Sequence, residues 1–280
     1  AVSTAAGDSH TCAILDDGSV ACWGSGEYGK IGDGGTTTRL VPTPTDSLGA
    51  GRTATSISAN WLHTCVILDD GSVACWGYNE NSELGDGTYI SRPSPTQTAS
   101  LGQGRKAIAI DGGLHHYCAV LDDGSVVCWG RGIDGQTGVG SMTNSQTPTQ
   151  TASLGLGRTA TSIAAGSTHT CAILDDGTIA CWGKGAHGQL GDPSSTQKLS
   201  PGQTASLGSG LTAEIITSKS DQNCAILSDL SVSCWGSNTY GKIGDGTTTN
   251  RHTPTQTASL GTGRTAHMNY ASATWSGTPT

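Results

Sequence analysis

The stretch HTCAILDDGSVACWG, residues 10–24, decides the fold of this chain. Close copies of it occupy residues 63–77, 116–130, 169–183 and 222–236, and the tryptophan near the end of each copy lies 53 residues after the preceding one. A glycine-rich turn, a threonine-rich stretch and a segment similar to PTQTASLG follow each copy in the same order. Self-similarity at a fixed period is typical of repeat folds, so the chain contains five units of 53 residues.

Each unit encodes a β-hairpin. In the first unit, Leu15 and Ser19 flank the loop Asp16-Asp17-Gly18, which favours a type I turn followed by glycine in the left-handed conformation. Counting back from this loop pairs Cys12 with Cys22 as non-hydrogen-bonded neighbours, whose Cα atoms lie about 4.5 Å apart, within the reach of a disulfide. The C-x2-4-C spacing of zinc sites is absent. We therefore predict five disulfides, one in each hairpin: Cys12–Cys22, Cys65–Cys75, Cys118–Cys128, Cys171–Cys181 and Cys224–Cys234.

The alternation of residues along the hairpin makes both of its faces apolar. Cys12, Ile14, Val20 and Cys22 share one face, and the opposite face carries Ala13, Leu15, Ala21 and Trp23. A sheet of a β-sandwich would show one polar face, whereas a propeller blade is covered by a neighbour on each side. The repeat length and the two apolar faces therefore predict an all-β propeller with one blade for each unit.

The same residues carry a family resemblance. The string HTCAILDDGSVACWG followed by YGKIGDG, residues 28–34, resembles the RCC1 repeat, over residues 1 to about 265. It is more similar still to the disulfide-containing RCC1-like proteins that prokaryotes secrete. The resemblance implies four-stranded blades, typically seven in a ring, whereas this sequence holds five complete units.

Two domain assignments follow. Residues 1–265 are expected to form the five-blade propeller, and residues 266–280 a tail that begins a partial sixth repeat. An unclosed ring leaves sheet edges exposed, so the tail is expected either to close the ring beside the first blade or to pair with a neighbouring molecule. The residues expected in that strand are Ala266, Met268, Tyr270 and Trp275.

Composition narrows the class of protein. The net charge of −8 argues against a nucleic-acid partner, which needs clustered basic residues. No apolar run approaches the length of about 20 residues that crosses a membrane. Regular disulfides indicate an oxidising compartment, so we expect a secreted or cell-surface protein.

Several polar residues recur with the repeat, and we interpret them as structural. The paired aspartates before each hairpin glycine suit turns better than a calcium site, since the EF-hand and RTX patterns are absent. In the fifth unit Leu230 replaces the glycine, which predicts a distorted turn. A ring of histidines could bind a metal, but a hydrogen bond to a loop carbonyl of the same or the next blade is the expected role of the recurring histidines. They are His10, His63, His116 and His169, and Gln222 takes their place in the fifth unit. The recurring arginines are interpreted as inter-blade hydrogen-bond donors: Arg52, Arg105, Arg158 and Arg264.

No catalytic or cofactor-binding motif occurs, so we expect neither an enzyme nor a cofactor or metal, although a site assembled from separate blades is a remaining alternative. Loops that vary within a constant framework are where recognition residues are expected. The main hypothesis is an extracellular binding or scaffold propeller that recognises a protein or a glycan through one rim. The resemblance to secreted RCC1-like proteins implies that this role can be that of an enzyme inhibitor. The alternative is a structural subunit that self-assembles through its terminal strands into a fibre or surface layer. The candidate rim residues are Tyr28, Trp61, Asn81, Tyr89, His115, Asp134, His187 and Tyr240.

Overall fold

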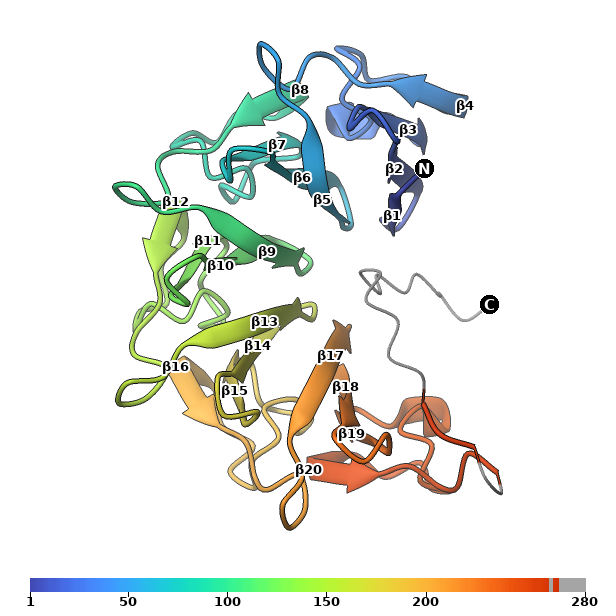
Figure 1. The fold of residues 1–280 in the computed structure, drawn as a ribbon, viewed down its shortest axis with the longest axis vertical. Coiled ribbons are helices and arrows are strands. Elements are labelled where there is room, and N and C mark those ends of the chain that lie inside the picture. Colours follow the sequence, from blue (N-terminus) through green and yellow to red (C-terminus); the bar gives the residue numbers. More distant parts are fainter. Residues whose placement is uncertain (262–263, 267–280) are drawn as a thin grey trace.

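The computed structural model describes residues 1–261 and 264–266, which form five four-stranded antiparallel sheets set side by side around a common centre (Figure 1). Each sheet is one blade, and its strands follow one another in sequence order from the centre outwards. The prediction of an all-β propeller with five blades is confirmed.

The strands of the five blades have the following bounds. Blade 1 contains β1 (Ser3–Ala6), β2 (His10–Ile14), β3 (Val20–Gly24) and β4 (Arg39–Pro44), with the short 3-10 helix η1 (Glu27–Gly29) between the last two. Blade 2 contains β5 (Ala54–Ala59), β6 (His63–Leu68), β7 (Val73–Gly77) and β8 (Arg92–Gln97). Blade 3 contains β9 (Ala107–Gly112), β10 (His116–Leu121), β11 (Val126–Gly130) and β12 (Ser145–Gln150). Blade 4 contains β13 (Ala160–Ala165), β14 (His169–Leu174), β15 (Ile179–Gly183) and β16 (Lys198–Gln203). Blade 5 contains β17 (Ala213–Lys219), β18 (Gln222–Leu227), β19 (Val232–Gly236), η2 (Thr239–Gly241) and β20 (Arg251–Gln256).

The central hairpin of each blade has the predicted register. In blade 1, Leu15 N donates to Ser19 O at 2.8 Å, and Gly18 has the left-handed φ of 78°. Cys12 lies opposite Cys22, and all five predicted disulfides are present, each with a Cα–Cα distance of 4.1 Å. The turn chemistry therefore sets the pairing on which each disulfide depends.

The hairpin turn of blade 5 contradicts the predicted distortion. Leu230 adopts the left-handed φ of 64°, and its amide donates to Leu227 O at 2.8 Å, as the glycine of the other turns does. The Asp229 carboxylate accepts from Ser231 N at 2.9 Å, which holds the turn from the other side. The backbone keeps the common geometry, and Leu230 carries the conformational cost instead.

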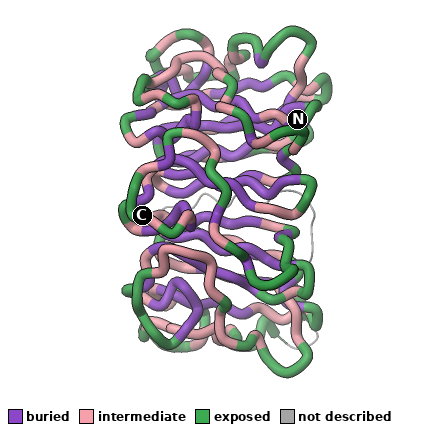
Figure 2. The backbone as a smooth tube through the Cα atoms, turned by 90° about the vertical axis from the view of Figure 1, so that its left-hand side faces the viewer, coloured by how far each residue is buried: buried purple, intermediate pink, exposed green. Residues whose placement is uncertain are grey.

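Neighbouring blades pack with unlike faces. Between blades 1 and 2, the disulfide face with Ile14 and Val20 meets the face of the next hairpin with Val66 and Trp76. The same arrangement forms hydrophobic clusters between blades 2 and 3, 3 and 4, and 4 and 5. Figure 2 shows that burial follows the strands, while exposed loops line both edges of the molecule. The loops at these two rims are therefore the parts of the blades that are free to bind.

Among the described residues, no hydrophobic cluster joins blade 5 to blade 1. Ala266 continues the repeat, because its amide donates to Leu230 O at 3.1 Å as Ala54 N donates to Gly18 O at 2.8 Å. The other residues of the predicted closing strand, Met268, Tyr270 and Trp275, lie outside the described residues.

Candidate functional site

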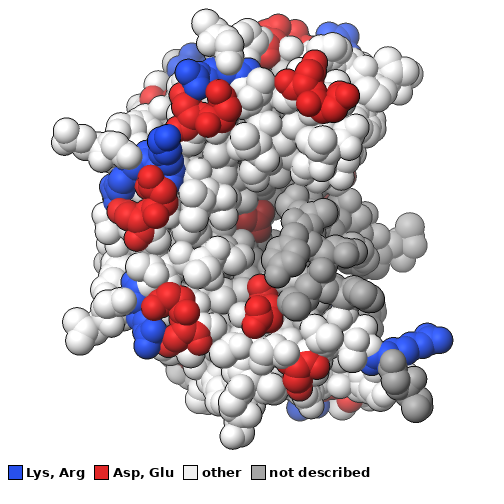
Figure 3. Space-filling model, in the orientation of Figure 1, with Lys and Arg blue, Asp and Glu red and all other residues white. Residues whose placement is uncertain are grey.

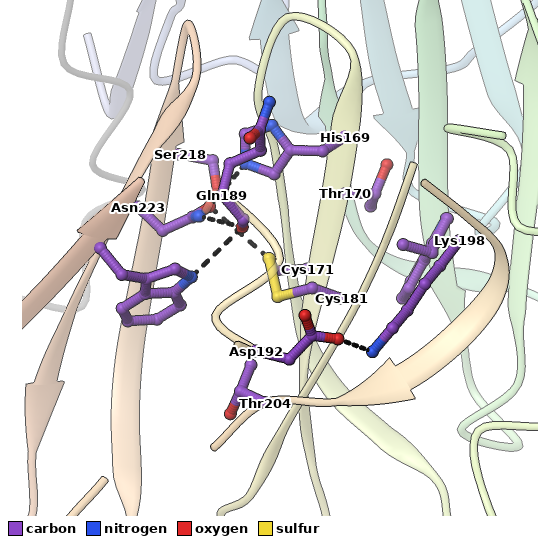
Figure 4. Close-up of a disulfide and its surroundings, with 12 residues drawn as sticks. His169, Thr170, Cys171, Cys181, Gln189, Asp192, Lys198, Thr204, Ser218 and Asn223 are labelled. Carbon is purple, nitrogen blue, oxygen red and sulfur yellow. Dashed lines mark hydrogen bonds and ion pairs between the residues drawn. A yellow bond between two sulfur atoms is a disulfide. The ribbon is translucent and has the colours of Figure 1, made fainter. Parts of the chain in front are cut away.

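The recurring histidines belong to the joints between blades. His10 Nε2 lies 2.8 Å from Thr64 Oγ1 of the next blade, and His116 Nε2 has the same contact with Thr170 at 2.8 Å. His63 contacts the Leu114 carbonyl at 3.1 Å. Figure 4 shows the equivalent joint beside the Cys171–Cys181 disulfide, where His169, Asn223 and Gln189 converge. The predicted hydrogen-bonding role is thus confirmed, and most of the partners are side chains of the following blade rather than loop carbonyls.

Burial keeps these histidines neutral. Desolvation lowers the pKa of His10 from 6.5 to about 3, with a further contribution from the nearby Lys30 ammonium, and it lowers that of His116 to about 3. The pKa of His63 falls to about 4 for the same principal reason. Among the described residues, no group of three or more His, Cys, Asp or Glu side chains gathers where it could hold a metal ion. These side chains therefore serve the joints between blades.

The contacts of the recurring arginines differ from the predicted inter-blade hydrogen bonds. Arg52 Nη1 lies 3.2 Å from Asp69 and 3.1 Å from Asp70, both in the hairpin turn of the blade that Arg52 precedes. Arg158 pairs in the same way with Asp175 and Asp176. Arg52 and Arg158 therefore tie their connecting loops to the hairpin turn of the following blade and do not link two blades. Figure 3 shows a face of the molecule on which basic side chains lie beside acidic ones.

The rim opposite the hairpin turns carries a row of aromatic side chains that spans three blades. Tyr28 of blade 1 meets Tyr78 of blade 2 edge-on, with ring centroids 5.0 Å apart. Tyr78 lies 6.2 Å from the ring of His115, which precedes β10 of blade 3. His115 in turn meets Trp61 of blade 2 edge-on at 5.0 Å. We call these four residues the aromatic rim surface.

A buried carboxylate holds the aromatic rim surface in place. Glu83 has a fully buried side chain, and its Oε1 accepts from His115 Nδ1 at 2.8 Å and from Asn81 Nδ2 at 2.9 Å. Its Oε2 accepts from the backbone amide of Asn81 at 2.8 Å. Burial opposes ionisation of Glu83, but the hydrogen bonds from His115 and Asn81 outweigh it and lower the pKa. An ionised, fully bonded carboxylate under the surface fixes the orientation of the His115 ring.

The exposed part of this surface is both apolar and polar. Trp61 and Tyr28 are 38% and 40% exposed. Tyr78 is half-buried, and its hydroxyl donates to Glu80 Oε2 at 3.0 Å. Burial and the neighbouring carboxylate raise the pKa of Tyr78 to about 12, so the phenol stays protonated. The surface thus offers flat rings next to hydrogen-bonding groups that are already oriented.

Four of the eight predicted rim residues meet here: Tyr28, Trp61, Asn81 and His115. The other four are dispersed. The Tyr89 hydroxyl accepts from Gln146 Nε2 at 2.7 Å, and Asp134 and His187 are half-buried in blades 3 and 4. Tyr240 is 90% exposed in blade 5. Whether any of the eight contacts a ligand stays a prediction.

The sequence analysis missed two members of this arrangement. Tyr78 directly follows the Trp-Gly pair, where the other units have Ser25, Arg131, Lys184 and Ser237. Glu83 occupies a position taken by lysine or glutamine in the other units. Each is thus the only aromatic or acidic residue at its repeat position, and this uniqueness is the signal that could have identified it.

Comparison with known proteins agrees with this architecture. A family model described as the RCC1-like domain matches residues 1–276. The chain belongs to the RCC1-like domain family. The ultraviolet-B receptor UVR8 of Arabidopsis thaliana is 28% identical over 256 residues, which cover 91% of this chain and 57% of UVR8. The human E3 ubiquitin-protein ligase HERC2 is 34% identical over 171 residues, which cover 61% of this chain and 4% of that protein.

Solved structures share the fold of this RCC1-like chain. Human WBSCR16 has a TM-score of 0.63 at 18% identity, over 92% of this chain and 82% of that chain. Yeast RCC1 (Prp20), solved bound to Kap60, has a TM-score of 0.57 at 17% identity, over 92% of this chain and 74% of that chain. The chain therefore spans a little over half of UVR8 and about three-quarters of the yeast propeller structure. No helix among the described residues is long and apolar enough to cross a membrane.

Proposed function

We propose that this RCC1-like chain is a non-enzymatic extracellular binding module that recognises a protein through the aromatic rim surface. The observation that carries the proposal is the row Tyr28–Tyr78–His115–Trp61, which is fixed from below by Glu83 and whose outer members, Tyr28 and Trp61, are exposed. Tyrosine and tryptophan that are held rigid and partly exposed are the residues that most often dominate protein interfaces. Five disulfides favour the extracellular setting.

A binding role suits the chemistry of this surface better than a catalytic one. Both oxygens of Glu83 are engaged by Asn81 and His115, and its side chain has no exposed surface. A carboxylate that is already satisfied and sealed from solvent orients its neighbour and has no access to a substrate. Within the family, yeast RCC1 was solved bound to another protein, Kap60. A protein ligand for this chain is therefore the first class to test.

The test compares three immobilised proteins: the wild type, the double variant Tyr28→Ala/Trp61→Ala, and the control Ile133→Ala. Ile133 is 44% exposed on the same rim in blade 3, outside the aromatic rim surface. Each is exposed to the secreted proteins of the organism that makes the chain and, separately, to an array of purified glycans. Circular dichroism establishes that all three are folded.

We expect one secreted protein to bind the wild type and Ile133→Ala with equal affinity, and to bind the double variant at least about thirtyfold more weakly, as for loss of roughly 2 kcal/mol at a hot spot. Equal binding to all three proteins would contradict the assignment of the site. Binding of a glycan alone, sensitive to the double substitution, would replace the protein ligand with a carbohydrate.

A further inference from the structure

A cavity of about 410 Å³ opens on the rim that carries the hairpin turns. Its wall is formed by the turn of blade 2, the end of the outer strand β8 and the loop that leads from β8 to β9 of blade 3. Volumes of about 300 to 1,000 Å³ are typical of sites for small molecules. We call this space the loop cavity, and the side chains in its wall include Asp70, Ser72, Gln97, Leu101, Arg105 and Lys106.

Arg105 lies in this wall in a conformation unlike that of Arg158, which occupies the same position in the next loop. Arg158 pairs with both aspartates of its hairpin turn. Arg105 Nη1 instead donates to Ser125 Oγ and to Gln150 Oε1, both at 3.1 Å, and approaches Asp123 only to 3.9 Å. The guanidinium of Arg105 is therefore held mainly by uncharged groups of blade 3.

The other edge of the Arg105 guanidinium is open to a ligand. Both of its hydrogen bonds come from Nη1, and within the described part of the chain none joins Nε or Nη2. These two atoms lie over Gly102 in the cavity wall, where an added Cβ would come within 2.4 and 2.2 Å of them. The N–H groups on this edge of a guanidinium are parallel and match two oxygens of a carboxylate or sulfate group.

Two further polar groups in the wall have no partner among the residues that the structure describes. Lys106 packs its stem on Gly71 of the hairpin turn, and only its backbone amide forms a hydrogen bond. The side-chain amide of Gln97 forms none, since the residue is held by its backbone pairing with Ala74. A lysine at this position is particular to the loop cavity, because the other units have threonine: Thr53, Thr159, Thr212 and Thr265.

The one carboxylate in the wall has a cation of its own. Asp70 Oδ1 accepts from the hydroxyl and the amide of Ser72 at 2.6 and 3.0 Å, and its Oδ2 pairs with Arg52 Nη1 at 3.1 Å. The hydrogen bonds from Ser72 lower the pKa of Asp70, and the Arg52 guanidinium adds to this effect. Because Arg52 offsets the charge of Asp70, Arg105 and Lys106 make the loop cavity positive.

We propose that the loop cavity binds an anionic sugar, one that bears a carboxylate or a sulfate group. The anionic group accepts from Nε and Nη2 of Arg105 and pairs with the Lys106 ammonium, while the Gln97 amide bonds a hydroxyl of the ring. A sugar suits the site better than a bare anion, because the cavity has the volume of a small-molecule site and an uncharged amide lies beside the two cations. The site is independent of the aromatic rim surface, which lies on the opposite rim.

The test titrates four compounds into the ¹⁵N-labelled protein and follows its backbone amide signals by NMR. They are methyl glucuronide, glucose 6-sulfate, the uncharged methyl glucoside, and inorganic sulfate, each at up to millimolar concentration. The variants Arg105→Leu and Lys106→Thr introduce residues that other units have at the same positions, Leu211 and Thr159. Arg158→Leu is the matched control, since that guanidinium is engaged by its own aspartates. Thermal unfolding shows that each variant is folded.

We expect at least one of the two anionic sugars to bind the wild type, Arg158→Leu and Tyr28→Ala/Trp61→Ala equally, and to shift amide signals of residues 97–106. Binding to Arg105→Leu and to Lys106→Thr is expected to be about tenfold weaker or more, because a charge-assisted hydrogen bond or ion pair is lost. Whether the glucuronide or the sulfate ester binds more tightly identifies the anionic group.

Three results would overturn the proposal. The first is that neither anionic sugar binds the wild type. The second is that methyl glucoside or inorganic sulfate binds as tightly as the anionic sugars, since the charge or the ring would then contribute nothing. The third is that Arg158→Leu weakens binding as much as Arg105→Leu does, which would place the effect in the general charge of the rim.

Discussion

At the scale of single residues, the buried histidines make stability depend on pH. His116 is held neutral in the folded protein with a pKa of about 3, whereas in the unfolded chain it is protonated below about 6.5. Because the pKa of His116 is lower in the folded protein than in the unfolded chain, the free energy of unfolding is at its full value above pH 6.5 and falls as the pH decreases toward 3. Protonation of each such histidine in the unfolded chain lowers the free energy of unfolding by about 2 kcal/mol between pH 7 and pH 5. Urea unfolding of the wild type is therefore expected to show a steep loss of stability over this interval.

The variant His116→Gln isolates one of these contributions. Glutamine occupies the same position naturally in blade 5, as Gln222. Between pH 7 and pH 5, we expect the free energy of unfolding of this variant to fall by about 2 kcal/mol less than that of the wild type. The reason is that one protonation of the unfolded chain is removed. Asp111, whose pKa burial raises to about 6, has the opposite effect, but it is common to both proteins and cancels in the comparison. A pH dependence of the stability of His116→Gln equal to that of the wild type would contradict the assignment.

The same scale shows what the sequence alone could predict. The hydrogen-bonding role of His10 follows from its period, but its partner Thr64 lies on another blade and emerges only from the packing. Tyr78 and Glu83 were missed because their role depends on His115, which approaches them from the next blade. Residues that repeat reveal the framework, whereas residues that occur once acquire a role only through neighbours that are distant in sequence.

At the scale of the elements, the hairpin is the unit that the sequence specifies most fully. Turn composition and cysteine spacing gave the register of the hairpins, and the structure has it in all five. The exception is the turn at Leu230, where the predicted distortion was wrong. The paired strands and the Asp229–Ser231 hydrogen bonds fix the backbone more strongly than the preference of one leucine can change it.

This cost can be measured with Leu230→Gly. Leucine at a left-handed φ costs roughly 1–2 kcal/mol, and glycine returns part of that gain through the greater entropy of the unfolded chain. We expect a net stabilisation of about 0.5–1 kcal/mol, measured as the free energy of unfolding in urea with the disulfides intact. The reverse change Gly177→Leu in blade 4 should destabilise, because a Cβ there would also meet Thr212 at 2.4 Å. A variant Leu230→Gly less stable than the wild type would show that side-chain contacts of Leu230 outweigh its strain.

At the scale of the whole molecule, the number of blades and their two-faced packing followed from the repeat, but the spacing of blades 1 and 5 did not. Each joint depends on small local choices, such as glycine at position 32 beneath Trp76, and the sequence repeats these choices identically whether or not the last blade meets the first. The angle between successive blades is a property of whole interfaces. Five units of the same pattern therefore define each joint and leave closure to tertiary geometry.

This arrangement predicts uneven stability along one repeated sequence. Residues 10–18 and 169–177 are both HTCAILDDG, so their intrinsic amide-exchange chemistry is the same. Counting the described residues, the first segment lies in blade 1, which has one face in a hydrophobic cluster, and the second lies in blade 4, which has both faces in clusters. Hydrogen exchange measured on the dilute single chain should therefore be slower in residues 169–177, by roughly tenfold for each 1.4 kcal/mol of local stability that the second joint adds. Equal exchange of the two segments in the dilute chain would mean that one packed face stabilises a blade as well as two.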